Sequence, residues 1–173
     1  GTFIDAYGSC GTGDLEFDFE HISGDPDGGI DVDSDGNIYI ADTGNDRVVK
    51  LNSTGGFVKT IGTAGTGDGE FTTPVAIEID SNDNLWVTDE DDSGKIVKYS
   101  TEGVYGNLEI SSGITKPASV ASNSTHLVVV DTNDDSVKTY KISDGNAAPK
   151  ATFGGNGSGT GQLYNPVDVE LDS

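Results

Sequence analysis

The sequence predicts an all-β fold made of repeated, antiparallel four-stranded sheets, and three observations support it. Similar segments recur along the 173 residues at intervals of 43 to 49 residues. Each repeat contains several short stretches in which apolar and polar residues alternate, as in half-buried strands. No long stretch has the period of an amphipathic helix. Repeats must be identified before individual motifs, because they determine the architecture.

The clearest recurring element is a glycine-rich connector. Its copies run from Gly11 to Phe17, from Gly65 to Phe71 and from Gly157 to Leu163. The second and third copies are followed after three residues by a proline, Pro74 or Pro166. After the first copy the proline comes later, so this repeat carries an insertion. Such glycines are expected to adopt backbone angles that other residues avoid.

The repeat-marking prolines are Pro26, Pro74, Pro117 and Pro166. Up to three strand-like segments follow each of them, and a fourth precedes the next connector. A turn rich in Asp, Asn and Gly separates the first two segments. The first segments are residues 30–33, 77–80 and 169–172, the second are 38–42, 85–89 and 127–131, and the third are 47–51, 96–99 and 137–140. Four strands in a repeat of this length predict the blade of a β-propeller, whose sheets stack on one another.

The repeats divide the chain into one propeller segment that is incomplete within these residues. Residues 1–25 are predicted to hold the outer strand and connector of a preceding blade. Three complete blades are predicted at 26–73, 74–116 and 117–165, and 166–173 is predicted to be the inner strand of a following blade. Three blades do not close a ring, so we expect further blades outside this stretch or from neighbouring chains.

The repeats resemble the NHL family of β-propellers. The best copy runs from Pro26 to Phe71 and carries the run Asp35-Gly36-Asn37-Ile38-Tyr39-Ile40-Ala41-Asp42, followed by Thr43-Gly44-Asn45-Asp46-Arg47-Val48. The later copies depart from this pattern, with Lys95 and Ser136 at the arginine position. The resemblance implies a propeller that is usually built with six blades.

Charge restricts the partners. The chain has 9 Lys and Arg against 30 Asp and Glu, a net charge of −21. This excess of negative charge argues against nucleic acid and anionic lipid as partners. It remains compatible with cations and cationic surfaces. Asp outnumbers Glu 22 to 8, and Ser, Thr, Gly and Asn are abundant. This composition favours an extracellular or cell-surface location.

One acidic motif resembles a calcium loop. Asp31, Asp33 and Asp35 alternate before Gly36, and Asp42 is the twelfth residue of the motif. Clustered carboxylates are the ligands that Ca²⁺ prefers. The alternative is structural, because Ile38 to Ala41 read as a strand that cannot curl around an ion. In that reading, Asp33 ends one strand and Asp42 ends the next.

A second acidic pattern is positional. Asp31, Glu78 and Glu170 occupy the same inner-strand position in three repeats, whereas the third complete blade has Ala121. Innermost strands line the central channel of a propeller. Like charges held close together raise one another's pKa or recruit a cation. The candidate metal ligands are therefore Asp31, Asp33, Asp35, Glu78 and Glu170, with Ca²⁺ as the possible ion. Alternatively, these side chains lean into solvent at the channel mouth.

Two further sets of residues are predicted to be structural. Asp42, Asp89 and Asp131 end the second strand of each blade, and we expect them to accept backbone N–H bonds in the following turn. Trp86, Tyr39 and Val129 are expected to pack between blades.

The favoured function is a non-catalytic extracellular binding or structural module. A propeller face formed by loops such as Asp18–Asp25 and Glu90–Gly94 would meet a protein or glycan. Some NHL-like propellers are lyases or lactonases with a metal in the channel, which is the first alternative. The two histidines, His21 and His126, share no repeat position, and no catalytic residues are predicted. A further alternative is an assembly whose chains complete one another's blades.

Overall fold

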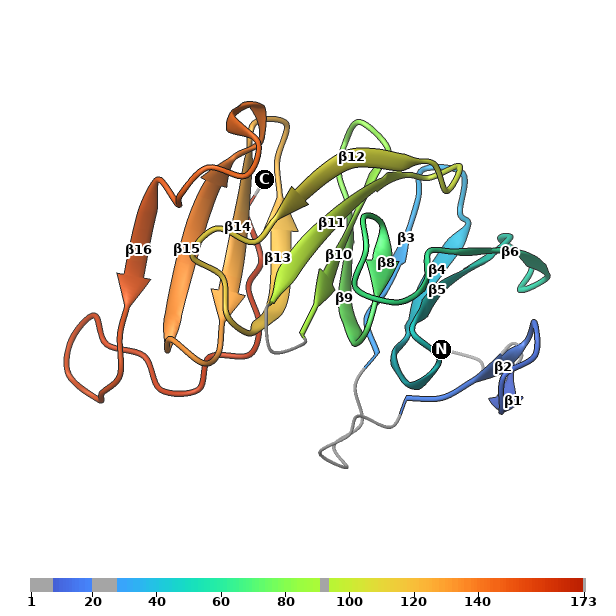
Figure 1. Ribbon diagram of the computed structural model, residues 1–173, viewed down its shortest axis with the longest axis horizontal. Helices are drawn as coiled ribbons and strands as arrows, with labels where there is room; N and C mark the ends of the chain where they lie inside the picture. Colours follow the sequence, from blue (N-terminus) through green and yellow to red (C-terminus); the bar gives the residue numbers. More distant parts are fainter. Residues whose placement is uncertain (1–7, 20–27, 91–93, 173) are drawn as a thin grey trace.

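Three four-stranded antiparallel sheets stand side by side in the computed structural model, which describes residues 8–19, 28–90 and 94–172 (Figure 1). In each sheet the strands follow one another in chain order, so each is a simple meander. Each sheet falls within one of the three predicted repeats and forms one blade. The described part of the chain contains no helix long and apolar enough to cross a membrane.

The first blade consists of β3 (Ile30–Val32), β4 (Ile38–Asp42), β5 (Arg47–Leu51) and β6 (Phe57–Ile61). The second consists of β9 (Pro74–Ile79), β10 (Asn84–Asp89), β11 (Lys95–Ser100) and β12 (Tyr105–Ile110). The third consists of β13 (Pro117–Ser122), β14 (His126–Asp131), β15 (Ser136–Lys141) and β16 (Ala151–Gly154). Two single-turn 3₁₀ helices, η1 (Thr43–Asn45) and η2 (Ile142–Asp144), follow β4 and β15.

Each blade has two faces, which we call leading (toward the preceding blade) and trailing (toward the following blade). Alternate residues of a strand point to opposite faces, so both faces of an enclosed blade must be apolar. β10 of the second blade shows this, since Leu85, Trp86 and Val87 are consecutive and all fully buried. The continuous apolar run thus reflects burial on both faces.

Two apolar clusters fill the spaces between the blades. The first lies between the first and second blades and contains Tyr39, Ala41, Val48, Ile61, Phe71, Ile77, Leu85, Val87, Val97 and Tyr99. The second lies between the second and third blades and contains Trp86, Ile96, Ile110, Ile114, Val120, Leu127, Val129 and Tyr140. Trp86, Tyr39 and Val129 therefore pack between blades, as predicted. Tyr39 and Trp86 lie on trailing faces, whereas Val129 lies on a leading face.

The glycine-rich connectors are small parallel elements. β1 (Ser9–Cys10) pairs with β2 (Glu16–Phe17), β7 (Thr63–Ala64) pairs with β8 (Glu70–Phe71), and Asn156 forms a parallel bridge to Leu163. In each connector the backbone N–H of the third residue donates to the Glu or Gln side chain three residues later, at 2.8 to 2.9 Å. The donors are Gly13, Gly67 and Gly159. This recurring hydrogen bond explains why the connector sequence repeats.

The predicted inner strand at 166–173 differs from expectation. Residues 166–172 form no strand, and Ser173 lies outside the described residues. An inner strand pairs only with the second strand of its own blade, and the described chain holds no such partner for this segment. The segment is nevertheless held against the third blade, because Thr132 Oγ1 donates to the Pro166 carbonyl at 2.9 Å. Thr43 makes the same contact to the Pro74 carbonyl at 2.7 Å.

Candidate functional site

Two of the three inner-strand acids join neighbouring blades. Asp31 on β3 accepts a hydrogen bond from the Ile79 N–H of the second blade, with 2.7 Å between Oδ2 and N. Glu78 on β9 accepts bonds from the N–H and the hydroxyl of Ser122 in the third blade, at 2.9 and 2.8 Å. Ile79 and Ser122 are equivalent residues, so the two carboxylates perform the same task one blade apart.

The pattern changes after the third blade. Ala121 occupies the acid position there and cannot form this bond. The link to the next segment comes instead from Ser119, whose hydroxyl donates to Asp168 Oδ1 at 2.8 Å. Glu170, the third predicted acid, is exposed. The sequence pattern could identify the repeated acids but not the backbone N–H that each one meets, because that partner lies 44 to 48 residues away.

We call Asp31, Glu78 and Glu170 the inner acid row, and the repulsion between its negative charges acts on Glu78. Burial raises the pKa of this carboxyl above its usual value, and the negative charges of Asp31 and Glu170 raise it further. Hydrogen bonds from Ser122 act in the opposite direction. The charges of Asp31 and Glu170 thus reach Glu78, and a bound cation at this row would relieve the repulsion.

The predicted calcium motif is divided between separate parts of the blade. The carboxylate of Asp33 accepts four hydrogen bonds, from the N–H groups of Asp35 and Asn37, the Asn37 amide and the Tyr39 hydroxyl, at 2.8 to 3.0 Å. Burial alone would raise the pKa of Asp33, but these bonds outweigh it and lower the pKa. Asp35 lies exposed in the turn. Asp33 therefore organises the turn between β3 and β4.

The same arrangement recurs at Asp80 in the second blade. Its carboxylate accepts bonds from the Asn82 and Asn84 N–H groups, the Asn84 amide and the indole N–H of Trp86. In the third blade Asn123 replaces the aspartate and bonds the Thr125 and His126 N–H groups at 3.0 and 2.9 Å. Repetition in all three blades indicates a turn-forming role for this position.

The five candidate metal ligands consequently do not form one group. Asp31 and Glu78 lie on inner strands and Glu170 lies in the segment after the third blade, whereas Asp33 and Asp35 belong to the first turn. Across residues 8–19, 28–90 and 94–172, no three His, Cys, Asp or Glu side chains lie arranged to hold a metal ion. Among the five candidates, the carboxylates of Asp31, Glu78 and Glu170 are oxygen ligands of the kind that Ca²⁺ prefers. Calcium binding by these three residues stays a prediction.

The strand-end aspartates form a third set, which we call the aspartate latch: Asp42 with Arg47, Asp89 with Lys95, and Asp131 with Lys138. All three carboxylates are fully buried. They accept backbone N–H bonds as predicted, but from the segment upstream of the blade. The donors are Asp18 at 2.7 Å, Thr73 at 2.6 Å and Thr115 at 2.8 Å. Among the described residues these backbone donors thus lie upstream rather than in the following turn, from which Asn45 donates its side-chain amide to Asp42 at 2.9 and 3.0 Å.

In the first blade, Arg47 joins the latch to the connector. Its Nε donates to Asp42 at 2.7 Å, and its terminal nitrogens donate to the carbonyls of Thr12, Gly13 and Glu16 at 2.7 to 3.1 Å. The planar guanidinium can reach the carboxylate and several carbonyls together. Arg47 thus fixes the glycine-rich connector on the end of the blade.

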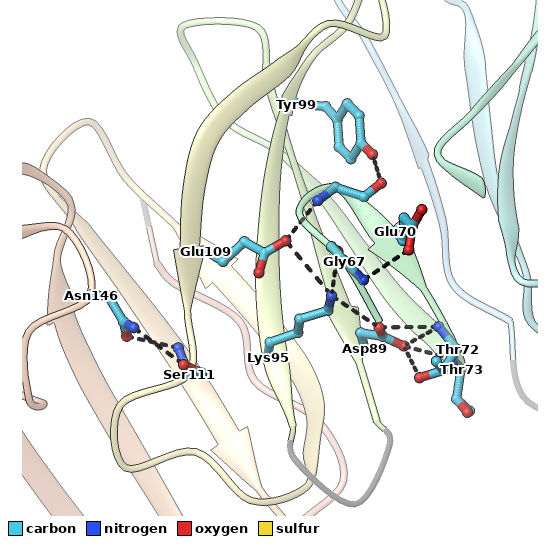
Figure 2. Close-up of polar contacts among 11 residues, drawn as sticks. Gly67, Glu70, Thr72, Thr73, Asp89, Lys95, Tyr99, Glu109, Ser111 and Asn146 are labelled. Carbon is cyan, nitrogen blue, oxygen red and sulfur yellow. Dashed lines mark hydrogen bonds and ion pairs between the residues drawn. The ribbon is translucent and has the colours of Figure 1, made fainter. Parts of the chain in front are cut away.

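In the second blade, Lys95 takes the same place (Figure 2). Its Nζ lies 3.4 Å from the Gly67 carbonyl, 3.9 Å from Asp89 and 3.7 Å from Glu109. Glu109 also accepts the Gly69 N–H at 2.8 Å, and the Tyr99 hydroxyl bonds the Gly69 carbonyl. Burial raises the pKa of Tyr99 to about 12, with the charge of Glu109 adding to the effect.

In the third blade the cation has moved along its strand. Ser136 stands opposite Asp131, where the other blades have Arg47 and Lys95. Lys138, two residues later, bonds Asp131 at 2.7 Å, the Gly113 carbonyl at 2.6 Å and Asp134. The Ser136 hydroxyl is buried and has no hydrogen-bond partner among the described residues. Comparison of the repeats could not reveal this role of Lys138, because Lys138 occupies a position where the other blades have Val49 and Val97.

The histidines do not converge with these acids. The Nδ1 of His126 lies 2.8 Å from the hydroxyl of its neighbour Thr125, in the turn before β14. His21 lies outside the described residues, as do most of the predicted loops at Asp18–Asp25 and Glu90–Gly94.

Comparison with known proteins agrees with this architecture. The DUF5128 family model, described as a 6-bladed beta-propeller, matches residues 31–148. A streptogramin B lyase structure superposes with a TM-score of 0.63 and 16% identity, over 83% of this chain and 44% of that one. No curated protein is similar enough to this chain to match it.

Two other solved structures share the fold. Hydrazine synthase from Kuenenia stuttgartiensis has a TM-score of 0.58 and 18% identity, covering 72% of this chain and 36% of its own. A catalytically inactive virginiamycin B lyase from Staphylococcus aureus with quinupristin has a TM-score of 0.53 and 17% identity, covering 66% and 38%. The chain thus spans less than half of each of these structures.

Proposed function

Because the chain belongs to the DUF5128 family of six-bladed β-propellers, we propose that it is part of a non-catalytic binding module at the cell surface or outside the cell. One observation carries this proposal. The charged side chains that recur from blade to blade, which are the ones that could otherwise serve in catalysis, join neighbouring blades or hold the connectors. We therefore expect the loops at one end of the blades to form the binding surface for a protein or glycan.

The distribution of charge favours a cationic protein as the partner. Four of the nine cationic side chains are turned inward, with exposed fractions of 15% for Arg47, 7% for Lys50, 12% for Lys95 and 5% for Lys138. Acidic connector residues such as Asp14 and Asp68 are exposed at the latch end. Because Asp42, Asp89 and Asp131 are buried as well, the outer surface keeps the strongly acidic character of the composition, and it complements Lys and Arg side chains.

Binding measurements on the 173-residue chain test this proposal. The probes are immobilised polylysine, an array of neutral glycans and double-stranded RNA. We expect binding to polylysine that weakens as salt increases, because exposed charges are screened. Asp14→Asn with Asp68→Asn should weaken it further, whereas Glu102→Gln, at the opposite end of the blades, should change it little. Equal binding by all variants, or preference for RNA, would contradict the proposal.

A second candidate is a lyase with a metal in the channel. Two observations favour it: solved lyases share the fold, and burial beside like charges raises the pKa of Glu78. Incubating the chain with quinupristin and Mg²⁺ or Ca²⁺, followed by mass spectrometry, separates the two functions. The binding-module proposal expects intact quinupristin. A product that separates from quinupristin by chromatography before the mass spectrometer, whether or not its mass differs, and that disappears in Glu78→Gln would establish catalysis.

A further inference from the structure

The chain contains three Asn-X-Ser/Thr sequons, the sequence at which N-linked glycans are attached, and they begin at Asn52, Asn123 and Asn156. In such a transfer, the asparagine Nδ2 forms a bond to the anomeric carbon of a sugar that carries a diphosphate. The carbon–oxygen bond to the diphosphate breaks, its electron pair leaves with the diphosphate, and a proton passes from Nδ2 to a base of the transferring enzyme. An acceptor in the folded protein therefore needs an accessible Nδ2 that is not held in another hydrogen bond.

Asn123 meets both requirements. It is exposed in the turn between β13 and β14, and its Oδ1 accepts the N–H groups of Thr125 and His126 at 3.0 and 2.9 Å. The hydroxyl of Thr125, the third residue of the sequon, donates to the same oxygen at 3.1 Å. The Nδ2 of Asn123 makes no hydrogen bond to any described residue. The side chain is thus held by its oxygen, and its nitrogen is available.

Comparison of the blades explains why this nitrogen has no partner. In the first blade Asp33 stands at the position of Asn123, and its Oδ2 accepts the hydroxyl of Tyr39 at 2.9 Å. The second blade repeats this contact with an indole N–H. In the third blade Val128 replaces the aromatic residue and has no polar atom to offer. The second polar atom of the turn residue is therefore released, and in Asn123 that atom is Nδ2.

Asn52 has the same geometry in the turn between β5 and β6. Its Oδ1 accepts the N–H and the hydroxyl of Thr54 at 3.0 and 2.8 Å, and the N–H of Gly56 at 2.9 Å. Its Nδ2 has no hydrogen-bond partner within the described part of the chain. Asn52 is half-buried, however, so a transferring enzyme reaches it less readily than Asn123.

Asn156 is exposed but its Nδ2 is engaged. It donates to Asp135 Oδ2 at 2.6 Å, and the main chain of Asn156 forms the parallel bridge to Leu163. Hydrogen bonds to a carboxylate are among the stronger ones in proteins. Transfer to Asn156 would have to break this bond, so exposure alone does not make Asn156 an acceptor.

We propose that the folded protein accepts N-linked oligosaccharides at Asn123 and, to a lesser extent, at Asn52, whereas Asn156 is excluded by its hydrogen bond. Asn52 follows β5, which begins at Arg47 of the aspartate latch. Asn123 follows β13, whose first residue pairs with Asp131 of the latch. Both acceptors thus lie at the end of the blades opposite the latch, where glycans leave the acidic connectors uncovered. Glycosylation of the native protein rests on the extracellular location in the proposed function, whereas the order of the acceptors does not.

A transfer reaction with the folded 173-residue chain tests the three sites together. The chain is incubated with a lipid-diphosphate-linked oligosaccharide and a purified oligosaccharyltransferase that modifies synthetic peptides of residues 119–127 and 152–160, which lack the fold. Peptide mapping by mass spectrometry gives the glycosylated fraction at each asparagine. We expect the largest fraction at Asn123, a smaller one at Asn52 and essentially none at Asn156. Any other order, or no transfer to the folded chain, would overturn the proposal.

A pair of variants separates the hydrogen bond from the sequon. Asp135→Ala frees the Nδ2 of Asn156 and leaves its sequon intact, so the glycosylated fraction at Asn156 should rise. Asp68→Ala removes an exposed carboxylate from another connector and is the matched control, in which Asn156 should stay unmodified. An unmodified Asn156 in Asp135→Ala would show that its hydrogen bond does not exclude transfer, and would overturn the proposal. Polylysine binding is measured separately, so the proposed function can fail while the order of acceptors holds.

Discussion

Lys138 shows at the level of one residue how a buried charge constrains the sequence. Its ammonium group neutralises Asp131, which is fully buried. Replacing Lys138 by Met keeps the volume but leaves that carboxylate without its cation, which typically costs about 3–5 kcal/mol of unfolding free energy. Urea unfolding at neutral pH measures the loss. Lys141→Met, at an exposed position on the same strand, is the control and should stay within about 0.5 kcal/mol of the parent.

The displaced cation also predicts a rescue. Combining Ser136→Arg with Lys138→Val copies the arrangement of Arg47 and Val49 in the first blade. The new guanidinium would bond Asp131 and take the place of the buried Ser136 hydroxyl, which has no hydrogen-bond partner among the described residues. We expect the double variant to recover most of the stability that Lys138→Val loses. A double variant no more stable than Lys138→Val would show that the two positions cannot substitute for each other.

The Asp131–Lys138 pair also determines a pH dependence. Burial would raise the pKa of Asp131, but bonds from Lys138 and Thr115 lower it below 3.8. The unfolded chain therefore takes up protons first on acidification, and this stabilisation, present above 3.8, is lost as pH falls through the lower native pKa. Thermal melts between neutral and acidic pH should show a shallower loss in Asp131→Asn than in the parent. Asp33 and Asp80, whose pKa values are also lowered, maintain the remaining slope. An unchanged acid slope would contradict this role for Asp131.

Sequence reasoning at this scale identified residue types better than partners. The strand-end aspartates were correctly expected to accept backbone N–H bonds. Their donors lie 15 to 24 residues upstream, so only the stacking of connector on blade brings them together. The role of Lys138 was hidden for another reason: in the repeats, Lys138 stands at a position where the other blades have a valine. The acids Asp31 and Glu78 were located, but not their interblade bonds.

At the scale of the element, the glycine-rich connectors predict a steric test. Gly62 has a φ of +76°, and a Cβ there would lie 2.3 Å from the ring of Phe71, which is fully buried. Gly145 has a similar φ of +63° but no atom within 4 Å of its would-be Cβ. Gly145→Ala should therefore cost only the backbone strain, about 1–3 kcal/mol, because its ψ of −139° lies outside the left-handed helical region. Gly62→Ala should cost about 1–3 kcal/mol more, because the ring must move. Equal losses in urea unfolding would contradict this account.

The elements themselves were largely visible in the sequence. Strands and connectors repeat because each blade solves the same packing problem, and alternation revealed which segments are strands. Residues 166–172 are the exception: their apolar alternation predicts a strand, yet they form none. Alternation reports the faces that a segment can bury, whereas a strand also needs a hydrogen-bonding neighbour.

At the scale of the whole molecule, the net charge of −21 acts against compactness, and the inner acid row concentrates that repulsion. The raised pKa of Glu78 means that the native state holds this proton more tightly than the unfolded chain. The contribution of Glu78 to stability therefore declines as pH rises above 4.5 through the native pKa. Gln at this position keeps an oxygen for Ser122 and removes the charge. Glu78→Gln should therefore raise the melting temperature at neutral pH and remove this part of the pH dependence.

Calcium distinguishes local repulsion from general screening in the same variant. Sodium chloride should stabilise the parent and Glu78→Gln to similar extents, because it screens charge over the whole surface. If the row of Asp31, Glu78 and Glu170 holds a cation, Ca²⁺ at matched ionic strength should stabilise the parent beyond sodium, and Glu78→Gln should lose that increment. Glu102→Gln removes the same charge at a site that is 77% exposed, so it should retain the increment. Equal calcium increments in all three proteins would contradict a cation at the row and leave the carboxylates with their interblade bonds alone.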